Sequence, residues 1–196
     1  GPHYTVTPRI LDILQEHNAR ATFFVLGNRV DNFPNIIQRE YSQGHEIGSH
    51  SFSHPQITTL TSDEIEYQFA ETEHRIQQYV PYTTKLVRPP YGQITQSLKE
   101  VLQKTFVLWS IDTQDWKTRD KDAIVSEVLN NVKDGDIILM HDMYSTTADA
   151  CEELIPALIE RGYQLVTVSE LLNAKEITPV AGSVYSRVLS TGNAAS

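Results

Sequence analysis

The sequence of 196 residues has little of what marks a special class of protein. Its one cysteine, Cys151, cannot form a disulfide within the chain, so packing must hold the fold. No apolar run approaches the roughly 18 residues of a membrane helix, and the first residues lack the charged-then-apolar layout of a signal peptide. With only 9 Gly and 9 Pro, the chain is neither collagen-like nor of low complexity. These absences indicate an ordinary globular protein.

Basic residues are also scarce, with 16 Lys and Arg against 25 Asp and Glu and a net charge of −9. A nucleic-acid partner would require a local basic patch strong enough to overcome repulsion from phosphates, and the sequence has none. The length matches one domain, since domains run at roughly 100–200 residues. We therefore expect one domain, a monomer and no nucleic-acid partner.

What the sequence does contain is an alternation of short apolar runs with longer amphipathic ones, which is typical of α/β folds. About six strands are predicted, over residues 21–26, 46–50, 85–88, 106–111, 137–140 and 165–168. Helices are predicted from Pro8 onward and over residues 35–42, 62–79, 96–103, 121–132, 146–161 and 169–173. This order fits a doubly wound sheet or a (β/α) barrel, but no glycine-rich phosphate motif follows the first strand, which disfavours a nucleotide-binding sheet.

Two histidines four residues apart, His50 and His54, follow the strand predicted over residues 46–50. Parallel α/β proteins gather their active sites at the carboxyl ends of strands. Neutral imidazole is a good zinc ligand, and a turn of this segment would bring both rings to one metal. A catalytic metal needs about three protein ligands and a water, so exposed or capping roles stay open for this pair.

Polar residues also follow two later strands. His141 comes directly after residues 137–140 and is a candidate for acid-base work, the alternative being a histidine bonded to backbone at the core edge. Asp112, Asp115 and Trp116 follow the predicted strand before it, where a carboxylate could either orient a histidine or cap a loop.

A fourth group, Arg88-Pro-Pro-Tyr91, follows the strand over residues 85–88. Its two prolines fix the backbone, so the segment either presents an arginine and a backbone N–H rigidly to a ligand or is merely a stiff turn. Serine or cysteine catalysis has weak support, because no Gly-x-Ser-x-Gly elbow is present and Cys151 falls in a predicted helix. The four groups would meet at the same end of the strands, around one opening of the fold, and this joint pattern favours a functional site.

Together these motifs resemble those of the polysaccharide deacetylase family, the metal-dependent carbohydrate esterases (family 4) of the NodB-homology type. The resemblance runs from about Pro8 to Asn173 and is strongest to bacterial peptidoglycan N-acetylglucosamine deacetylases. It implies an irregular (β/α)7 barrel, with residues 1–173 as the catalytic domain, residues 174–196 as an extension or tail, and 190–196 as a frayed end. Its motifs match His50-Ser-Phe-Ser-His54, Arg88-Pro-Pro-Tyr91, Asp112-Thr-Gln-Asp115-Trp116 and Leu139-Met-His141.

The resemblance assigns a role to each motif. His50 and His54 would bind a divalent metal, usually Zn²⁺ with Co²⁺ or another first-row metal as the alternative, which activates a water to attack the acetamide carbonyl. His141 would be the general acid and Asp115 would orient it. The resemblance also implies that the Tyr91 backbone N–H forms the oxyanion hole and that Arg88 pairs with the general base. The wall around the acetyl group and the sugar would be formed by Pro90, Tyr91, Trp109, Trp116 and Leu139.

One family motif is missing: the Asp-Asp pair within Thr-Phe-Asp-Asp-Gly, which supplies the base and the third metal ligand. Gly1-Pro2 stands where the residues after that pair belong. We therefore expect the catalytic domain to be N-terminally incomplete, lacking the first strand, with the function belonging to a longer protein and this chain alone inactive.

The expected reaction is hydrolytic N-deacetylation of N-acetylglucosamine in peptidoglycan. Chitin or chito-oligosaccharides and acetyl-xylan are alternative substrates, because they present the same acetyl chemistry. A non-catalytic glycan-binding fragment is the alternative from another class, although binding alone has no need of an acid and its orienting carboxylate. The substrate implies a location outside a bacterial cell or on its surface, with any membrane anchor in a segment outside this chain.

Overall fold

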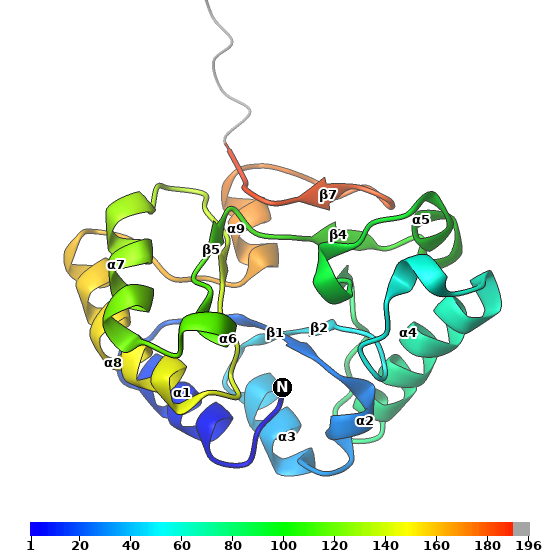
Figure 1. The fold of residues 1–196 in the computed structure, drawn as a ribbon, viewed down its shortest axis with the longest axis horizontal. Coiled ribbons are helices and arrows are strands. Elements are labelled where there is room, and N and C mark those ends of the chain that lie inside the picture. Colours follow the sequence, from blue (N-terminus) through cyan, green and yellow to red (C-terminus); the bar gives the residue numbers. More distant parts are fainter. Residues whose placement is uncertain (190–196) are drawn as a thin grey trace, which may run out of the picture.

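Seven short parallel strands form the centre of the computed structural model, which describes residues 1–189 (Figure 1). Five make one sheet and two make a separate pair. The pair is β5 (Ile111–Asp112) with β6 (Ile138–Leu139). The sheet has the order β1-β2-β3-β4-β7, which are Thr22–Val25, Glu46–Ser49, Leu86–Val87, Thr105–Val107 and Val184–Tyr185. Because paired strands run parallel, the loops after β1 to β6 can meet at one end of the molecule.

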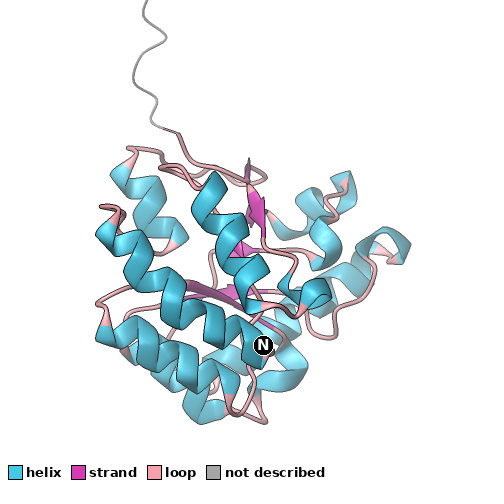
Figure 2. Cartoon of the chain, turned by 60° about the vertical axis from the view of Figure 1, so that its left-hand side comes forward, coloured by secondary structure: helices cyan, strands magenta, loops and turns pink. Residues whose placement is uncertain are grey.

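Helices surround the strands on the outside (Figures 1 and 2). They are α1 (Val6–Glu16), α2 (Gly27–Val30), α3 (Pro34–Ser42), α4 (Ser62–Gln77), α5 (Gln96–Leu102), α6 (Asp115–Thr118), α7 (Lys121–Asn131), α8 (Ser145–Glu160) and α9 (Val168–Ala174). Two 3₁₀ turns, η1 (Ile57–Thr59) and η2 (Pro90–Gly92), lie in the loops after β2 and β3. None of the helices within residues 1–189 is long and apolar enough to cross a membrane.

Local sequence explains where the main helices begin and end. Thr61 and Glu64 form a capping box at the start of α4, in which each side chain accepts the other's backbone N–H. Asp120 caps α7 by accepting the Ala123 N–H. Beyond α8, Gly162 adopts a φ of +86°, a left-handed conformation that glycine enters without a steric penalty.

Apolar side chains between the helices and the strands form the core. The largest cluster joins α1, α3 and α8 to β1 and β2 around Leu11, Ile37 and Ile47, all fully buried. At Gly48 a Cβ atom would lie 2.4 Å from the ring of Phe24, its partner in β1, so glycine leaves the space that this ring occupies. Tight packing thus fixes the strand ends from which the loops leave.

The ring of strands is open between β1 and β6, since no strand lies between them among residues 1–189. The Leu26 N–H at the end of β1 donates a hydrogen bond to the Gly1 carbonyl oxygen (3.1 Å). Residues of both strands, including Phe23 and Leu139, line a cavity at this opening.

Most predicted elements are confirmed to within a few residues, and the α/β barrel class is confirmed. Two strand predictions are wrong. The run over 106–111 is divided into β4 and β5, which pair with different partners because the chain leaves one sheet at Leu108 and joins the other at Ile111. Residues 165–167 form no strand and Val168 begins α9, because its backbone N–H is bonded to the Thr22 hydroxyl (2.9 Å) rather than to a neighbouring strand.

The predicted extension from residue 174 contains β7, which pairs with β4 through Val184 and Tyr185. Val188 is 1% exposed and packs in a core cluster with Leu86 and Val107. The described part of the extension therefore completes the sheet, while the domain boundary at 173 stays a prediction. The predicted frayed end, 190–196, lies outside the described residues.

Candidate functional site

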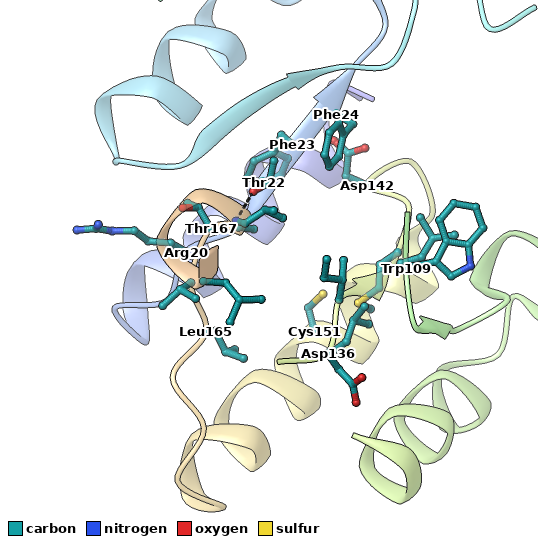
Figure 3. A pocket seen from close by; sticks show the side chains of 18 of the residues that line it. Arg20, Thr22, Phe23, Phe24, Trp109, Asp136, Asp142, Cys151, Leu165 and Thr167 are labelled. Atoms are coloured by element: carbon teal, nitrogen blue, oxygen red, sulfur yellow. Dashed lines mark hydrogen bonds between the residues drawn. The ribbon is translucent and has the colours of Figure 1, made fainter. Parts of the chain in front are cut away.

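A cavity of about 1330 Å³ opens among the loops that follow β1, β2, β3, β5 and β6. Figure 3 shows its inner part, where Phe23 and Phe24 of β1 lie opposite Trp109 and Cys151. Most of the residues predicted for a site line it: His50, His54, Arg88, Tyr91, Trp109, Trp116, Leu139 and His141. Four motifs far apart in sequence are therefore brought together at one place.

His50 and His54 follow β2 and lie with their ring centroids 4.8 Å apart. The His50 Nδ1 is 2.5 Å from the Arg88 carbonyl oxygen, which can only accept, so Nδ1 carries the proton and Nε2 keeps its lone pair. Burial lowers the pKa of His50 to about 3 and also lowers the pKa of His54. Both imidazoles are therefore neutral at pH 7, the form that a metal requires.

The turn that presents these rings is built from unusual backbone. Ser51 and His54 have φ values of 72° and 61°, in the left-handed region that non-glycine residues seldom adopt. The buried Ser51 hydroxyl accepts the His54 N–H (3.0 Å), and the Gln68 side chain accepts the N–H groups of Phe52 and Ser53 (2.9 Å each). These contacts hold a local conformation that the residues alone disfavour.

His141 follows β6 and pairs with Asp115 from the loop after β5. The His141 Nδ1 lies 2.7 Å from one Asp115 carboxylate oxygen, and the other oxygen accepts the His141 backbone N–H (2.7 Å) and the Thr147 hydroxyl (2.7 Å). Asp115 is fully buried; burial raises its pKa, but these hydrogen bonds outweigh burial and the net pKa is lowered. The carboxylate stays ionised and fixes both the tautomer and the orientation of His141.

Arg88 places a guanidinium inside the protein, at 8% exposure. It donates to the backbone carbonyls of Val107 (3.3 Å) and Leu108 (3.0 Å), and lies over the Phe24 ring at 4.3 Å. No carboxylate among the described residues pairs with it, and burial lowers its pKa to about 9. A buried cation held only by carbonyls and rings is ready to accept an anionic partner.

Tyr91 also has a left-handed backbone, with a φ of 58°, and no hydrogen bond from its backbone N–H to another described residue is found. Its ring packs edge-on against His54 at 4.7 Å and is 61% exposed. Trp116 is 48% exposed at the mouth and Leu139 is buried. Pro90 is buried and does not line the cavity, whereas Pro89 does, so the substrate-wall role expected of Pro90 does not match its position.

Two residues beside the site were not predicted, the buried Thr147 and the partly exposed Asp142. Thr147 in α8 holds Asp115, and its only signal in the sequence is its place six residues after His141. Asp142 accepts the Thr7 hydroxyl (2.6 Å), and one of its carboxylate oxygens lies 3.4 Å from the Gly1 nitrogen. Gly1 itself lines the cavity.

The metal-ligand set is partial. Among residues 1–189, no three His, Cys, Asp or Glu side chains come together in a way that could hold a metal ion. His50 and His54, neutral and with the Nδ1 of His50 held by a backbone carbonyl, fit two ligand positions, because metal-binding histidines ordinarily bond their other nitrogen in this way.

Comparisons with known proteins agree with this geometry. The family model described as "Polysaccharide deacetylase" matches residues 1–107. The chain is 44% identical over 176 residues to the peptidoglycan-N-acetylmuramic acid deacetylase PdaC of Bacillus subtilis, covering 90% of this chain and 38% of that protein. It is 39% identical over 175 residues to the peptidoglycan-N-acetylglucosamine deacetylase PgdA of Listeria monocytogenes, covering 89% and 38%. The chain thus spans about two fifths of these relatives.

A solved family 4 acetyl xylan esterase from Clostridium thermocellum, in complex with a cobalt ion, superimposes with a TM-score of 0.91 at 35% identity, covering 96% of this chain and 95% of that one. Fold, motif geometry and sequence similarity lead to the same assignment: the chain belongs to the polysaccharide deacetylase family.

Proposed function

We propose that the protein to which this chain belongs hydrolyses the acetamide of N-acetylglucosamine residues in peptidoglycan. The observation that carries the proposal is the placement of the His50–His54 pair and the His141–Asp115 pair on one cavity. Peptidoglycan is the named substrate of both curated relatives, although one is named for N-acetylmuramic acid.

In this proposal His50 and His54 hold a divalent metal, Zn²⁺ in the first instance. When bound, such a metal polarises the acetyl carbonyl and lowers the pKa of a water. A catalytic zinc takes three protein ligands. We propose that the third ligand and the general base are the Asp-Asp pair of the family motif, located ahead of Gly1.

Two observations support a place for that motif. The opening between β1 and β6 leaves room for a strand, and the Leu26 N–H already bonds to Gly1 at its mouth. Arg88 is a buried cation with no carboxylate partner among the described residues, which a base carboxylate would supply. A buried charge left unpaired costs several kcal/mol, of order 3–5, so such a partner would stabilise the site.

His141 acts as the general acid in this scheme. Its Nδ1–H keeps its hydrogen bond to the Asp115 carboxylate. The proton on Nε2 is transferred to the nitrogen of the departing amine. The Tyr91 backbone N–H donates to the oxygen that gains negative charge in the tetrahedral intermediate. Trp109, Trp116 and Leu139 present apolar surface to the acetyl methyl and to the C–H face of the sugar.

The test compares the chain as given with a version extended by a strand that ends in Thr-Phe-Asp-Asp before Gly1. Both are loaded with Zn²⁺, and amine release is measured on peptidoglycan, N-acetylglucosamine oligomers and acetyl-xylan. We expect release from peptidoglycan by the extended version alone. Equal release by the two versions would contradict the role of the Asp-Asp pair, while binding without release by either would favour a glycan-binding module.

The proposed substrate places the protein outside a bacterial cell or at its surface. The partner is then a neutral sugar backbone that carries peptides, and the net charge of −9 does not oppose its approach as it would oppose nucleic acid.

A further inference from the structure

Arg119 lies just beyond α6, in contact with residues that line the cavity, and is held in a defined position. Its guanidinium carbon lies 3.2 Å from the centroid of the Tyr144 ring, and its Nε donates to the Trp116 carbonyl oxygen (2.9 Å). Tyr144 and Trp116 both line the cavity, and the Tyr144 ring centroid is 6.1 Å from that of His141. An exposed arginine is thus fixed against the Tyr144 ring and the Trp116 backbone, close to the proposed acid.

The backbone reinforces this placement. Arg119 has a φ of 50°, and Gln114, which precedes α6, has a φ of 51°. Two left-handed residues therefore flank the one-turn helix that carries Asp115 and Trp116. Left-handed conformations at non-glycine residues persist where surrounding contacts determine them, and they gather at functional sites.

The charge on Arg119 has no carboxylate partner among the described residues. Five other arginines, Arg9, Arg20, Arg39, Arg75 and Arg187, form ion pairs with Asp or Glu, whereas the exposed Arg161 likewise has no such pair within residues 1–189 and donates to the Leu129 carbonyl. The neighbouring Asp120 accepts the Ala123 N–H at the start of α7 (2.9 Å). What sets Arg119 apart from Arg161 is its position against the Tyr144 ring, next to His141.

Its chemistry matches a carboxylate. A guanidinium offers planar pairs of N–H donors to a carboxylate, and stacking on Tyr144 leaves the donors at its edge free. Nε is already used by the Trp116 carbonyl, so the two terminal nitrogens remain for a ligand.

We propose that Arg119 binds a carboxylate of the peptidoglycan strand, next to the sugar in the cavity, and so selects peptidoglycan over neutral glycans. This inference rests on the proposed function and names its substrate more closely. The carboxylate comes either from the lactyl ether of a neighbouring N-acetylmuramic acid or from a stem peptide. Chitin carries neither group, so the contact would be absent with it.

The test is a binding titration on the chain as given, so that it does not depend on turnover. The first ligand is the disaccharide of N-acetylglucosamine and N-acetylmuramic acid, the second is its methyl ester, and the third is the same disaccharide with its stem peptide. We expect Arg119→Gln to weaken binding of the acid disaccharide by about tenfold, as for loss of a charge-assisted hydrogen bond, and to leave the ester unchanged. Arg119→Lys should recover part of the loss.

Lys117→Gln is the matched control, because it removes one positive charge from the same short helix. We expect it to change binding by less than about twofold, since exposed charges not in contact are largely screened. An equal loss in the Arg119→Gln and Lys117→Gln variants, an equal loss on the acid disaccharide and its ester, or no effect of Arg119→Gln on either the acid disaccharide or the peptide-bearing one would each overturn the proposal.

The third ligand separates the two sources. A tenfold effect of Arg119→Gln seen only with the peptide-bearing ligand would assign the contact to the stem peptide and still support the proposal. Failure of the deacetylation assay described above, with the Arg119 effect intact, would overturn the catalytic function and leave the binding site in place.

Discussion

The two sides of the cavity hold the same residue type against different partners. On the β2 side, the His50 Nδ1 meets a backbone carbonyl, a neutral acceptor, and burial lowers the pKa of the ring to about 3. On the β6 side, the His141 Nδ1 meets the ionised Asp115 carboxylate. In both rings Nδ1 is held by an acceptor, which is neutral for His50 and ionised for His141, and Nε2 is left for the proposed role.

The two histidines thus differ in the partner of Nδ1, which fits the metal-ligand role proposed for His50 and the acid role proposed for His141. Both partners come from elsewhere in the chain, Arg88 after β3 and Asp115 after β5. Four predictions would break or sharpen this contrast.

The largest effect is expected from removing the charged partner on the β6 side. Asp115→Asn keeps the shape of the side chain but removes the negative charge that orients His141. We expect kcat of the strand-extended, Zn²⁺-loaded protein to fall by about 10²–10⁴-fold, the usual contribution of a general acid. Asp112→Asn in the same loop is the control, and a similar fall in that variant would contradict a specific role for Asp115.

Next in size is the loss of a ligand on the β2 side. His50→Ala should weaken Zn²⁺ binding by at least about 100-fold, since changes to residues that only support ligands already cost 10–100-fold. Competition with a colorimetric chelator measures it. His74→Ala, at an exposed position on α4, should bind zinc like the parent chain; an unchanged affinity in His50→Ala would remove His50 from the metal site.

The third prediction concerns pH. The folded-state pKa of His50 is about 3 and that of His45 about 4, both lowered chiefly by burial, against 6.5 in the unfolded chain. The unfolded state therefore binds more protons as pH falls below 6.5, so stability is full above that pH and decreases down to about pH 3–4. We expect a loss of order 1 kcal/mol per histidine between pH 7 and 5, seen in urea unfolding. A His50→Gln variant with an unreduced slope would contradict it.

The smallest effect tests a single contact behind the acid. Thr147→Val removes the hydroxyl that donates to Asp115 and leaves a buried carboxylate oxygen with one bond fewer. We expect a stability loss of about 1–2 kcal/mol and a several-fold fall in kcat, far less than in Asp115→Asn. Thr146→Val at the preceding position is the control, because the Thr146 hydroxyl has no hydrogen-bond partner.

Much of this site was predictable from the sequence because the relevant residues directly follow strands. The apolar runs before His50, Arg88, Asp112 and His141 predict those strand ends, and parallel strands bring their ends together. The position of Pro90 outside the cavity lining was not predictable, because the two prolines look alike in sequence and both are buried, and only the tertiary structure turns Pro89 toward the cavity.

The errors in the fold have one physical origin. Strands of two or three residues carry almost no alternation of their own, so the division of 106–111 into β4 and β5 and the absence of a strand at 165–167 depend on which partner lies alongside. For the same reason β7 was missed, since Val184 and Tyr185 become a strand only beside Phe106 and Val107.

The sequence by itself determined the alternation of strands and helices, the four motifs at strand ends and the family they belong to, because periodicity and residue type are local properties. The tertiary structure alone decided which nitrogen of His50 is protonated, that Thr147 holds Asp115, that Arg88 is buried without a carboxylate partner among the described residues, and that Arg119 stacks on Tyr144. Each of these depends on a contact between residues distant in the chain or turned toward each other by a loop, and only folding brings such groups within bonding distance.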